Sequence, residues 1–146
     1  MNVALNKLND KITCFNAAVM HDNFDGECAT LRRSRDPAVN YRTSVLKKTG
    51  DPITVPAVHF GTLLRDHTPS LVKMDNEGAE IEILQQSIQW ESVQKLVFEY
   101  TVNPSTNSDA KGVGRKIEGL LRSAGFKQKH STFSPGPIDR LWWCWK

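Results

Sequence analysis

Three carboxylates around one glycine are the strongest chemical signal in this sequence. Asp75, Glu77 and Glu80 surround Gly78 and directly follow the apolar run Leu71–Met74, which has the pattern of a short buried strand. When a strand ends in a carboxylate and passes at once into a helix, that carboxylate lies at the carboxyl edge of the sheet. Open α/β sheets bind their ligands at this edge. We therefore expect an acid-lined site here.

The spacing of these acids suggests proton-transfer chemistry. Glu77 and Glu80 are three residues apart, so they share one helix face, and the helix N-terminus tolerates their negative charge. Neighbouring carboxylates raise one another's pKa, so that one of them can act as a base near neutral pH. The simpler interpretation, favoured for each residue alone, is a set of first-turn acids with a loop glycine, and Glu80 is then a solvated helix carboxylate. Together the residues form a more specific pattern.

The elements that must position these acids alternate between strands and helices. Buried strands are expected at Lys11–Met20, Leu71–Met74 and Val93–Tyr100, and an edge strand at Ile53–Val58, which contains Pro56. Helices are expected at Phe60–Arg65, from the acidic motif to about Trp90, and at Gly114–Ala124 before Gly125. Phe126–Thr132 and Arg140–Lys146 are expected to close the chain as an antiparallel hairpin. Leu31–Arg42 is expected to be an irregular loop, and a strand on either side of it is left open. This is an α/β pattern.

Composition excludes several classes of protein. The 146 residues suit one domain, with 39% hydrophobic and 24% charged residues and a formal net charge of +3. There is no apolar run of membrane-spanning length and no signal-peptide pattern, so we expect a cytoplasmic protein without a membrane partner. The three cysteines include no CxxC pair and the four histidines have no ligand spacing, so no metal site is expected.

The acidic motif closely resembles that of a known family. Val72–Glu80, VKMDNEGAE, is similar to the hydrophobic strand and K-hydrophobic-D-x-E-G-A-E of FkbM-type methyltransferases. Weaker similarities occur at Asn6–Asn9, Ile12–Val19, Asp25–Gly26 and Val55–Leu64, so the resemblance covers most of Met1–Tyr100. It implies the class I, Rossmann-like α/β fold that binds S-adenosylmethionine.

One half of that fold has no counterpart here. The family's first strand ends in a glycine-rich loop and its second in an acidic residue, but the sequence holds no GxGxxG, and Gly112–Gly114 follows a polar loop. With the implied strand order 3-2-1-4-5-7-6, we expect an incomplete class I sheet that lacks its first two strands. Residues 1–146 then form a single, N-terminally truncated domain, in which the strand at Ile12–Val19 has nothing to pair with and Leu71–Met74 lacks one neighbour. Exposed edges of this kind are costly.

The resemblance also implies site roles. Asp75 would lie where the methyl group meets its acceptor, orienting the methionine amino group or the acceptor hydroxyl, and Glu77 and Glu80 would shape the same pocket. Asn16 and Ala17 would contact the adenine ring, although a strand-end turn explains Asn16 more simply. The implied cofactor is S-adenosylmethionine, and the missing loop leaves open whether this chain binds it alone.

Three functions compete for this sequence. The first is an S-adenosylmethionine-dependent O-methyltransferase acting on a small-molecule or sugar hydroxyl, and the second is a non-catalytic remnant or interaction module. The third, ranked lowest, is a nucleic-acid-binding protein that uses Arg32, Arg33, Arg35 and exposed aromatic residues. The tryptophans at period two in Leu141–Trp145 are more simply explained as core on one face of a strand than as a binding platform. A partner chain or a homo-oligomer is expected to cover the open sheet edge.

Overall fold

The chain consists of short helices and strands arranged around two sheets. The structure is a computed structural model, and it describes residues 2–33, 43–44, 50–76, 80–86, 89–101, 110–132 and 139–146. In chain order the elements are α1 (Asn2–Leu5), β1 (Ala18–Met20), β2 (Cys28–Arg33), β3 (Thr43–Ser44), β4 (Asp51–His59), α2 (Phe60–His67), β5 (Leu71–Met74), α3 (Glu80–Leu84), β6 (Lys95–Thr101), α4 (Ala110–Ser123), β7 (Lys127–Thr132) and β8 (Asp139–Trp145). Of the helices in this part of the chain, none has the length and apolar character that a membrane crossing requires.

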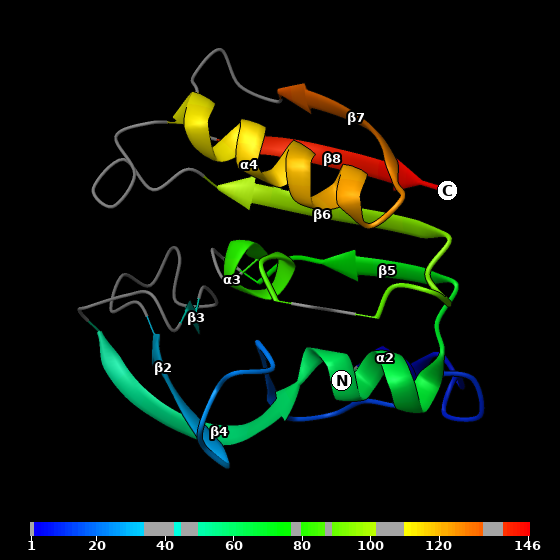
Figure 1. The fold of residues 1–146 in the computed structure, drawn as a ribbon. Coiled ribbons are helices and arrows are strands. Elements are labelled where there is room, and N and C mark those ends of the chain that lie inside the picture. The colour runs from blue at the N-terminus through cyan, green and yellow to red at the C-terminus, as the bar shows by residue number, and fades with distance from the viewer. Residues whose placement is uncertain are drawn as a thin grey trace.

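The strands form two mixed sheets, and Figure 1 shows α4 lying across the second one. The described strands of the first sheet have the order β1-β4-β2-β3 and those of the second the order β5-β6-β8-β7. In the second sheet β5 is parallel to β6, whereas β8 is antiparallel to both β6 and β7. The order agrees with the last four strands of the resembled fold, and the α/β class is confirmed. The incomplete class I sheet remains a prediction.

Side-chain periodicity explains the elements of the second sheet. Ile117 and Leu121 lie one turn apart on the buried face of α4, and the helix ends before Gly125, whose φ of 84° suits a residue without Cβ. In β8 the side chains alternate: Trp142 is fully buried, whereas Trp143 is 49% exposed. The tryptophans at period two, Trp143 and Trp145, therefore face away from the core. The expectation that they form core on one face of the strand was wrong.

Aromatic side chains connect α2 to the core of the second sheet. The ring of Trp90 lies 5.7 Å from that of Phe60 in α2 and 5.7 Å from that of Phe126. Phe98 of β6 stacks on Trp142 of β8 with an interplanar angle of 6°. The buried cluster draws its residues from α2, β5, α3, β6, α4 and β8 and from the segments between them. Helix α2 thus belongs with the second sheet, although it follows a strand of the first.

The first strand is shorter than expected and it has a partner. Strand was expected over Lys11–Met20, but only Ala18–Met20 is strand, and Ile12 and Phe15 are 43% and 62% exposed. The reason is pairing: Ala18–Met20 lies parallel to residues 57–59 of β4, and only these three residues find partners. The expectation that this strand would have nothing to pair with was therefore wrong.

Pro56 lies in an inner strand, not in the expected edge strand. Strand β4 lies between β1 and β2. The N–H of Ala57 donates to the carbonyl of Glu27 on the β2 side, so the ring nitrogen of Pro56 faces the opposite side. Pairing with β1 begins only at Ala57. The missing N–H of Pro56 therefore falls where no described strand lies beside β4 on that side.

Two other boundaries also differ from the predictions. Arg32 and Arg33 belong to strand β2 and not to an irregular loop, and the guanidinium of Arg32 donates to the carbonyl of Gly50 at 3.2 Å. Arg35 lies outside the described residues. Helix α3 ends at Leu84, well before the expected end near Trp90.

Candidate functional site

Asp75 follows β5 and lies on the surface. Its side chain is 52% exposed, and its Oδ2 lies 3.5 Å from Nζ of Lys73 on the same strand. An exposed ion pair of this kind contributes little to stability. The carboxylate therefore lies, half-exposed, at the carboxyl end of a parallel strand.

Glu80 lies in entirely different surroundings. It is the first residue of α3 and only 1% exposed, and its Oε1 accepts the backbone N–H of Asn76 at 2.6 Å. A carboxylate that accepts a backbone N–H forms one of the stronger classes of hydrogen bond. Glu80 thus ties the end of β5 to the start of α3. The simpler expectation of a solvated carboxylate was wrong for this residue.

The expected group of three carboxylates is therefore only partly described. Glu77 lies outside the described residues. Asp75 and Glu80 are connected through Asn76, because Glu80 accepts the backbone N–H of Asn76, the residue that follows Asp75. The structure thus gives one carboxylate an outward position and the other a buried contact with the loop.

Asn16 and Ala17 lie before β1 and not at its end. Asn16 is exposed, Ala17 is half-buried, and the strand begins only at Ala18. The carboxyl end of this strand is followed instead by His21 and Asp22. The proposed contact of Asn16 and Ala17 with adenine consequently rests on the resemblance alone.

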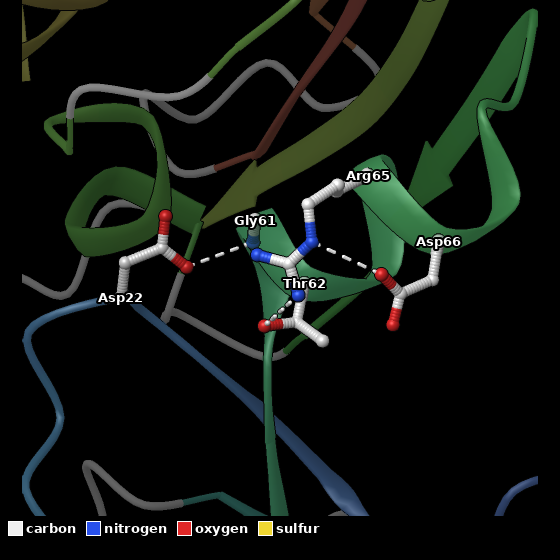
Figure 2. A network of polar contacts seen from close by, with 5 residues as sticks. All are labelled: Asp22, Gly61, Thr62, Arg65 and Asp66. Carbon is white, nitrogen blue, oxygen red and sulfur yellow. Dashed lines mark hydrogen bonds and ion pairs between the residues drawn. The ribbon is translucent and has the colours of Figure 1, made fainter.

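The contacts made by the loop after β1 were not predicted from the sequence, and they reach both α2 and α3. Oδ1 of Asp22 accepts the backbone N–H of Gly61 at the start of α2, at 2.8 Å (Figure 2). Nε2 of His21 lies 3.9 Å from the carboxylate of Glu82 on α3. The signal was available, because Asp22 follows an apolar strand just as Asp75 does. The expected strand, Lys11–Met20, ends at the same residue as β1, so only the long-range contacts of this loop escaped prediction.

A groove of about 320 Å³ runs alongside β5. One wall is the helix face formed by Phe60, Leu63, Leu64 and His67, which follow one another at helix spacing. The opposite wall is β5 itself, with Asn76 beyond its end, and Val19 of β1 also lines the groove. A mainly apolar groove with a few polar groups at one end suits a ligand or a chain segment that is itself largely apolar.

The outer face of α2 carries only a surface network. Nε of Arg65 lies 3.1 Å from Oδ1 of Asp66, and the two side chains are 65% and 53% exposed (Figure 2). The Arg65 guanidinium also donates to Oγ1 of Thr62. These contacts lie on a solvated surface, and they make Asp66 a useful counterpart of Asp75 for comparison.

Comparison with known proteins identifies the family. The family model of the FkbM methyltransferase domain matches residues 1–127. Searches of curated proteins and of solved structures gave no match. The match covers the first sheet, the groove and the carboxyl end of β5, together with all the site residues discussed above. The chain belongs to the FkbM methyltransferase domain family.

Proposed function

We propose that this chain serves S-adenosylmethionine-dependent methyl transfer to a hydroxyl group of a small molecule or sugar, at the carboxyl end of β5. The observation that carries the proposal is the family match over residues 1–127. It is supported by the position of the acidic motif, which directly follows a parallel strand.

Methyl transfer to oxygen needs alignment of the reactants and removal of the hydroxyl proton. Asp75 has the exposed carboxylate that can orient the hydroxyl and accept its proton. Glu80 is buried and bonded to Asn76, so its proposed role is to hold the loop that carries Asp75. Glu77 is proposed to shape the same pocket. Bound S-adenosylmethionine would supply the methyl group.

The described residues do not make up a complete site for this cofactor. The groove offers an apolar wall for a flat ring, and Asn16 and Ala17 are proposed adenine contacts from the family resemblance. The sequence, however, contains no glycine-rich loop through which backbone could approach the cofactor closely. We therefore derive no step through the cofactor. Asp75 is proposed to orient either the methionine amino group of the cofactor or the acceptor hydroxyl.

Calorimetry with S-adenosylhomocysteine tests the proposal. We expect heat from one site per chain, with binding weakened at least about tenfold by Asp75→Asn, which corresponds to ~1.4 kcal/mol. Asp66→Asn is the matched control, because Asp66 is equally exposed (53% against 52%) and also pairs with a neighbouring cation. The control should bind like the unmodified chain.

The second candidate is a non-catalytic interaction module. It is favoured by the open groove along β5 and by the absence of the glycine-rich loop from the sequence. If millimolar S-adenosylhomocysteine gives no heat with the folded chain, the methyltransferase proposal fails for this chain and the interaction module takes its place.

A further inference from the structure

We propose that the face of the second sheet opposite α4 binds single-stranded nucleic acid, whose bases stack on Trp143 and Trp145 and whose phosphates pair with lysines of the neighbouring strands. This activity goes beyond the proposed methyl transfer. The site uses β6, β8 and β7 in the second sheet, and it includes neither the groove along β5 nor the acidic motif.

Side-chain alternation assigns the residues of this face. The buried side chains of β6 and β8 pack with those of α4 in one core cluster. Successive side chains of a strand point to opposite faces, so Trp143 and Trp145 of β8 lie on the other side of the sheet. Lys95 and Val97 of β6 lie on this same side, because the register places them opposite the two tryptophans. Figure 1 shows α4 in front of β6 and β8, so the face with the tryptophans is turned away from the viewer.

The strand register places lysines beside both tryptophans. Trp145 lies opposite Lys95 of β6 on one side and Lys127 of β7 on the other, and Trp143 lies opposite Lys129 of β7. Directly opposed side chains have Cβ atoms about 4.5–5.5 Å apart. All three lysines are exposed, and none of them forms an ion pair with another described residue. The face therefore presents two aromatic rings among three positive charges.

The acidic residues near this face do not neutralise these lysines. Among the described side chains that β6, β8 and β7 contribute to the face, one is a carboxylate: Glu99, which lies opposite Leu141. Glu99 is half-buried and four residues beyond Lys95, which corresponds to about 13 Å along the strand. Asp75 pairs with Lys73 of β5, and both are left out of the site for that reason. The end of the face around Trp145 is therefore positively charged.

The composition of these strands suits a face in contact with solvent. Strands that are covered on both faces have nearly continuous apolar sequences, whereas lysines lie at alternate positions here, Lys127 and Lys129 in β7 and Lys95 beside buried Leu96 in β6. Lysine is almost never fully buried. The exposure of this face thus follows from the residues of the strands themselves. Two neighbouring tryptophans are unusual on such a face, and exposed apolar patches with a polar rim mark interaction sites.

The arrangement of rings and charges favours a nucleic-acid strand over a membrane. Trp143 and Trp145 are two residues apart, hence about 7 Å along β8, and each ring can stack on one base of a single strand. The phosphates of that strand alternate with its bases, as lysines and tryptophans do on this face. A surface that enters a membrane presents a continuous apolar face instead, and here the lysines interrupt it. The bases of a duplex are already stacked on one another, so the ligand is a single strand.

Fluorescence anisotropy with a labelled oligonucleotide tests this inference. The probe is fluorescein-labelled oligothymidylate of about ten nucleotides, which is titrated with the full chain at low salt. We expect saturable binding that Trp143→Ala weakens at least about fivefold and Trp143→Phe weakens less, because a smaller ring can still stack. Tryptophan fluorescence should also be quenched, and the quenching should be lost when Trp143 and Trp145 are both replaced, since Trp90 and Trp142 are buried.

Matched variants separate stacking from charge. Phe15 is 62% exposed and contacts His67 of α2, outside this face, so Phe15→Ala should leave binding unchanged. Lys127→Gln and Lys129→Gln should each reduce the dependence of log K on log salt concentration by about 0.7, because each removes one phosphate contact. Lys116→Gln on the exposed side of α4 should not change it. An oligomer of abasic sites with the same number of phosphates should bind at least about fivefold more weakly.

Three results would overturn the inference. The first is no binding of oligothymidylate at about 100 μM chain in low salt. The second is equal binding of the abasic oligomer or of the variant with both Trp143→Ala and Trp145→Ala, since charge alone would then be responsible. The third is binding to phosphatidylserine vesicles that oligothymidylate does not displace, which would make the face a membrane surface. Calorimetry with S-adenosylhomocysteine is run without oligonucleotide, so failure here is distinguishable from failure of the proposed function.

Discussion

Asp75 and Glu80 show how residues of one motif acquire different tasks. They are five positions apart and both follow β5, yet Asp75 is half-exposed beside Lys73 while Glu80 is buried against the backbone of Asn76. A buried carboxylate is tolerated when hydrogen bonds replace its lost water. The contact with Asn76 therefore makes Glu80 a residue that holds the loop in which Asp75 lies.

We predict that Glu80→Ala lowers the free energy of unfolding by ~1–3 kcal/mol, because the Asn76 N–H loses a buried acceptor. Glu80→Gln should recover part of this loss, since its carbonyl oxygen can still accept. The control is Glu82→Ala on the same helix, whose half-exposed carboxylate lies 3.9 Å from Nε2 of His21 and should contribute less than ~1 kcal/mol. Urea unfolding measures all three variants, and equal losses for Glu80→Ala and Glu82→Ala would contradict the assigned role.

The buried thiol of Cys144 should make the free energy of unfolding depend on pH in the alkaline range. Burial raises the pKa of the Cys144 thiol from 9.0 to about 12, because the thiolate is poorly solvated in the core. Between these two values the unfolded chain ionises at this residue while the folded chain stays protonated. The unfolded state then binds fewer protons, so stability falls as pH rises, by at most ~1.4 kcal/mol per pH unit. Below about pH 9 this contribution is fully present.

Urea unfolding at about pH 8 and about pH 10 measures this dependence. The comparison is with Cys144→Ala, which lacks the titrating group and should lose less stability over the same interval. In addition, Cys14 and Cys28 are exposed, so a thiol reagent should modify them in the folded chain and reach Cys144 only after unfolding. Equal pH dependence in both proteins would show that the Cys144 thiol does not contribute.

Among the elements, α2 depends on a residue from outside its own segment. Its N-cap residue, His59, makes no capping hydrogen bond with its side chain, and Asp22 from the loop after β1 accepts the N–H of Gly61 instead. Gly61 leaves the room for this contact, because a Cβ there would lie 2.3 Å from Oδ2 of Asp22. The helix that forms one wall of the groove is therefore held by the first sheet.

We predict that the effects of Asp22→Ala and Gly61→Ala on the free energy of unfolding are strongly non-additive. Asp22→Ala removes a cap and should cost ~0.5–2 kcal/mol. Gly61→Ala should also destabilise the unmodified chain, because its methyl group displaces Asp22. Once Asp22 is alanine, however, Gly61→Ala should be neutral or stabilising by up to ~1 kcal/mol, since alanine is the better helix former.

Gly119→Ala in α4 is the control for this cycle. A Cβ there meets no atom within 4 Å, so the substitution should stabilise the chain whether or not Asp22 is present. The four proteins of the cycle and the control are compared by thermal and urea unfolding. Additive effects of Asp22→Ala and Gly61→Ala would contradict the capping contact.

At the scale of the whole molecule, stability is divided unequally between the two sheets. The buried cluster lies on the second sheet and includes α2, whereas the described strands β2 and β4 show many exposed positions. Strands β6 and β8 each lie between two neighbours and carry fully buried side chains such as Leu96, Phe98 and Trp142. The second sheet should therefore open last.

Native-state hydrogen exchange should reveal this order. Amides of β6 and β8 are expected to exchange only through global unfolding, and those of β2 and the first half of β4 at least about tenfold faster, a difference of ~1.4 kcal/mol or more. Equal exchange free energies in both sheets would mean that the molecule unfolds as one unit.

Periodicity and turn chemistry in the sequence were sufficient to predict the strands and the long helix α4 in the second half of the molecule. The apolar run Leu71–Met74 is the observed strand β5, and the expected final hairpin forms as β7 and β8. The expectation that Leu71–Met74 would be a buried strand was wrong, because only Met74 is buried and Leu71 is 57% exposed. The amphipathic helix before Gly125 is also present, with an earlier start. These features depend on neighbours in sequence or on one dominant face, so the local pattern is informative.

The sequence by itself determined the family motif, the α/β class and the positions of most elements after residue 60. Only the tertiary structure decided that Ala18–Met20 pairs with β4, that Glu80 is buried while Asp75 is exposed, and that Asp22 caps α2. The physical reason is the range of the interactions. Helix and strand periodicity is set within a few residues, whereas strand pairing, burial of a charge and capping from a distant loop depend on contacts between residues far apart in the chain.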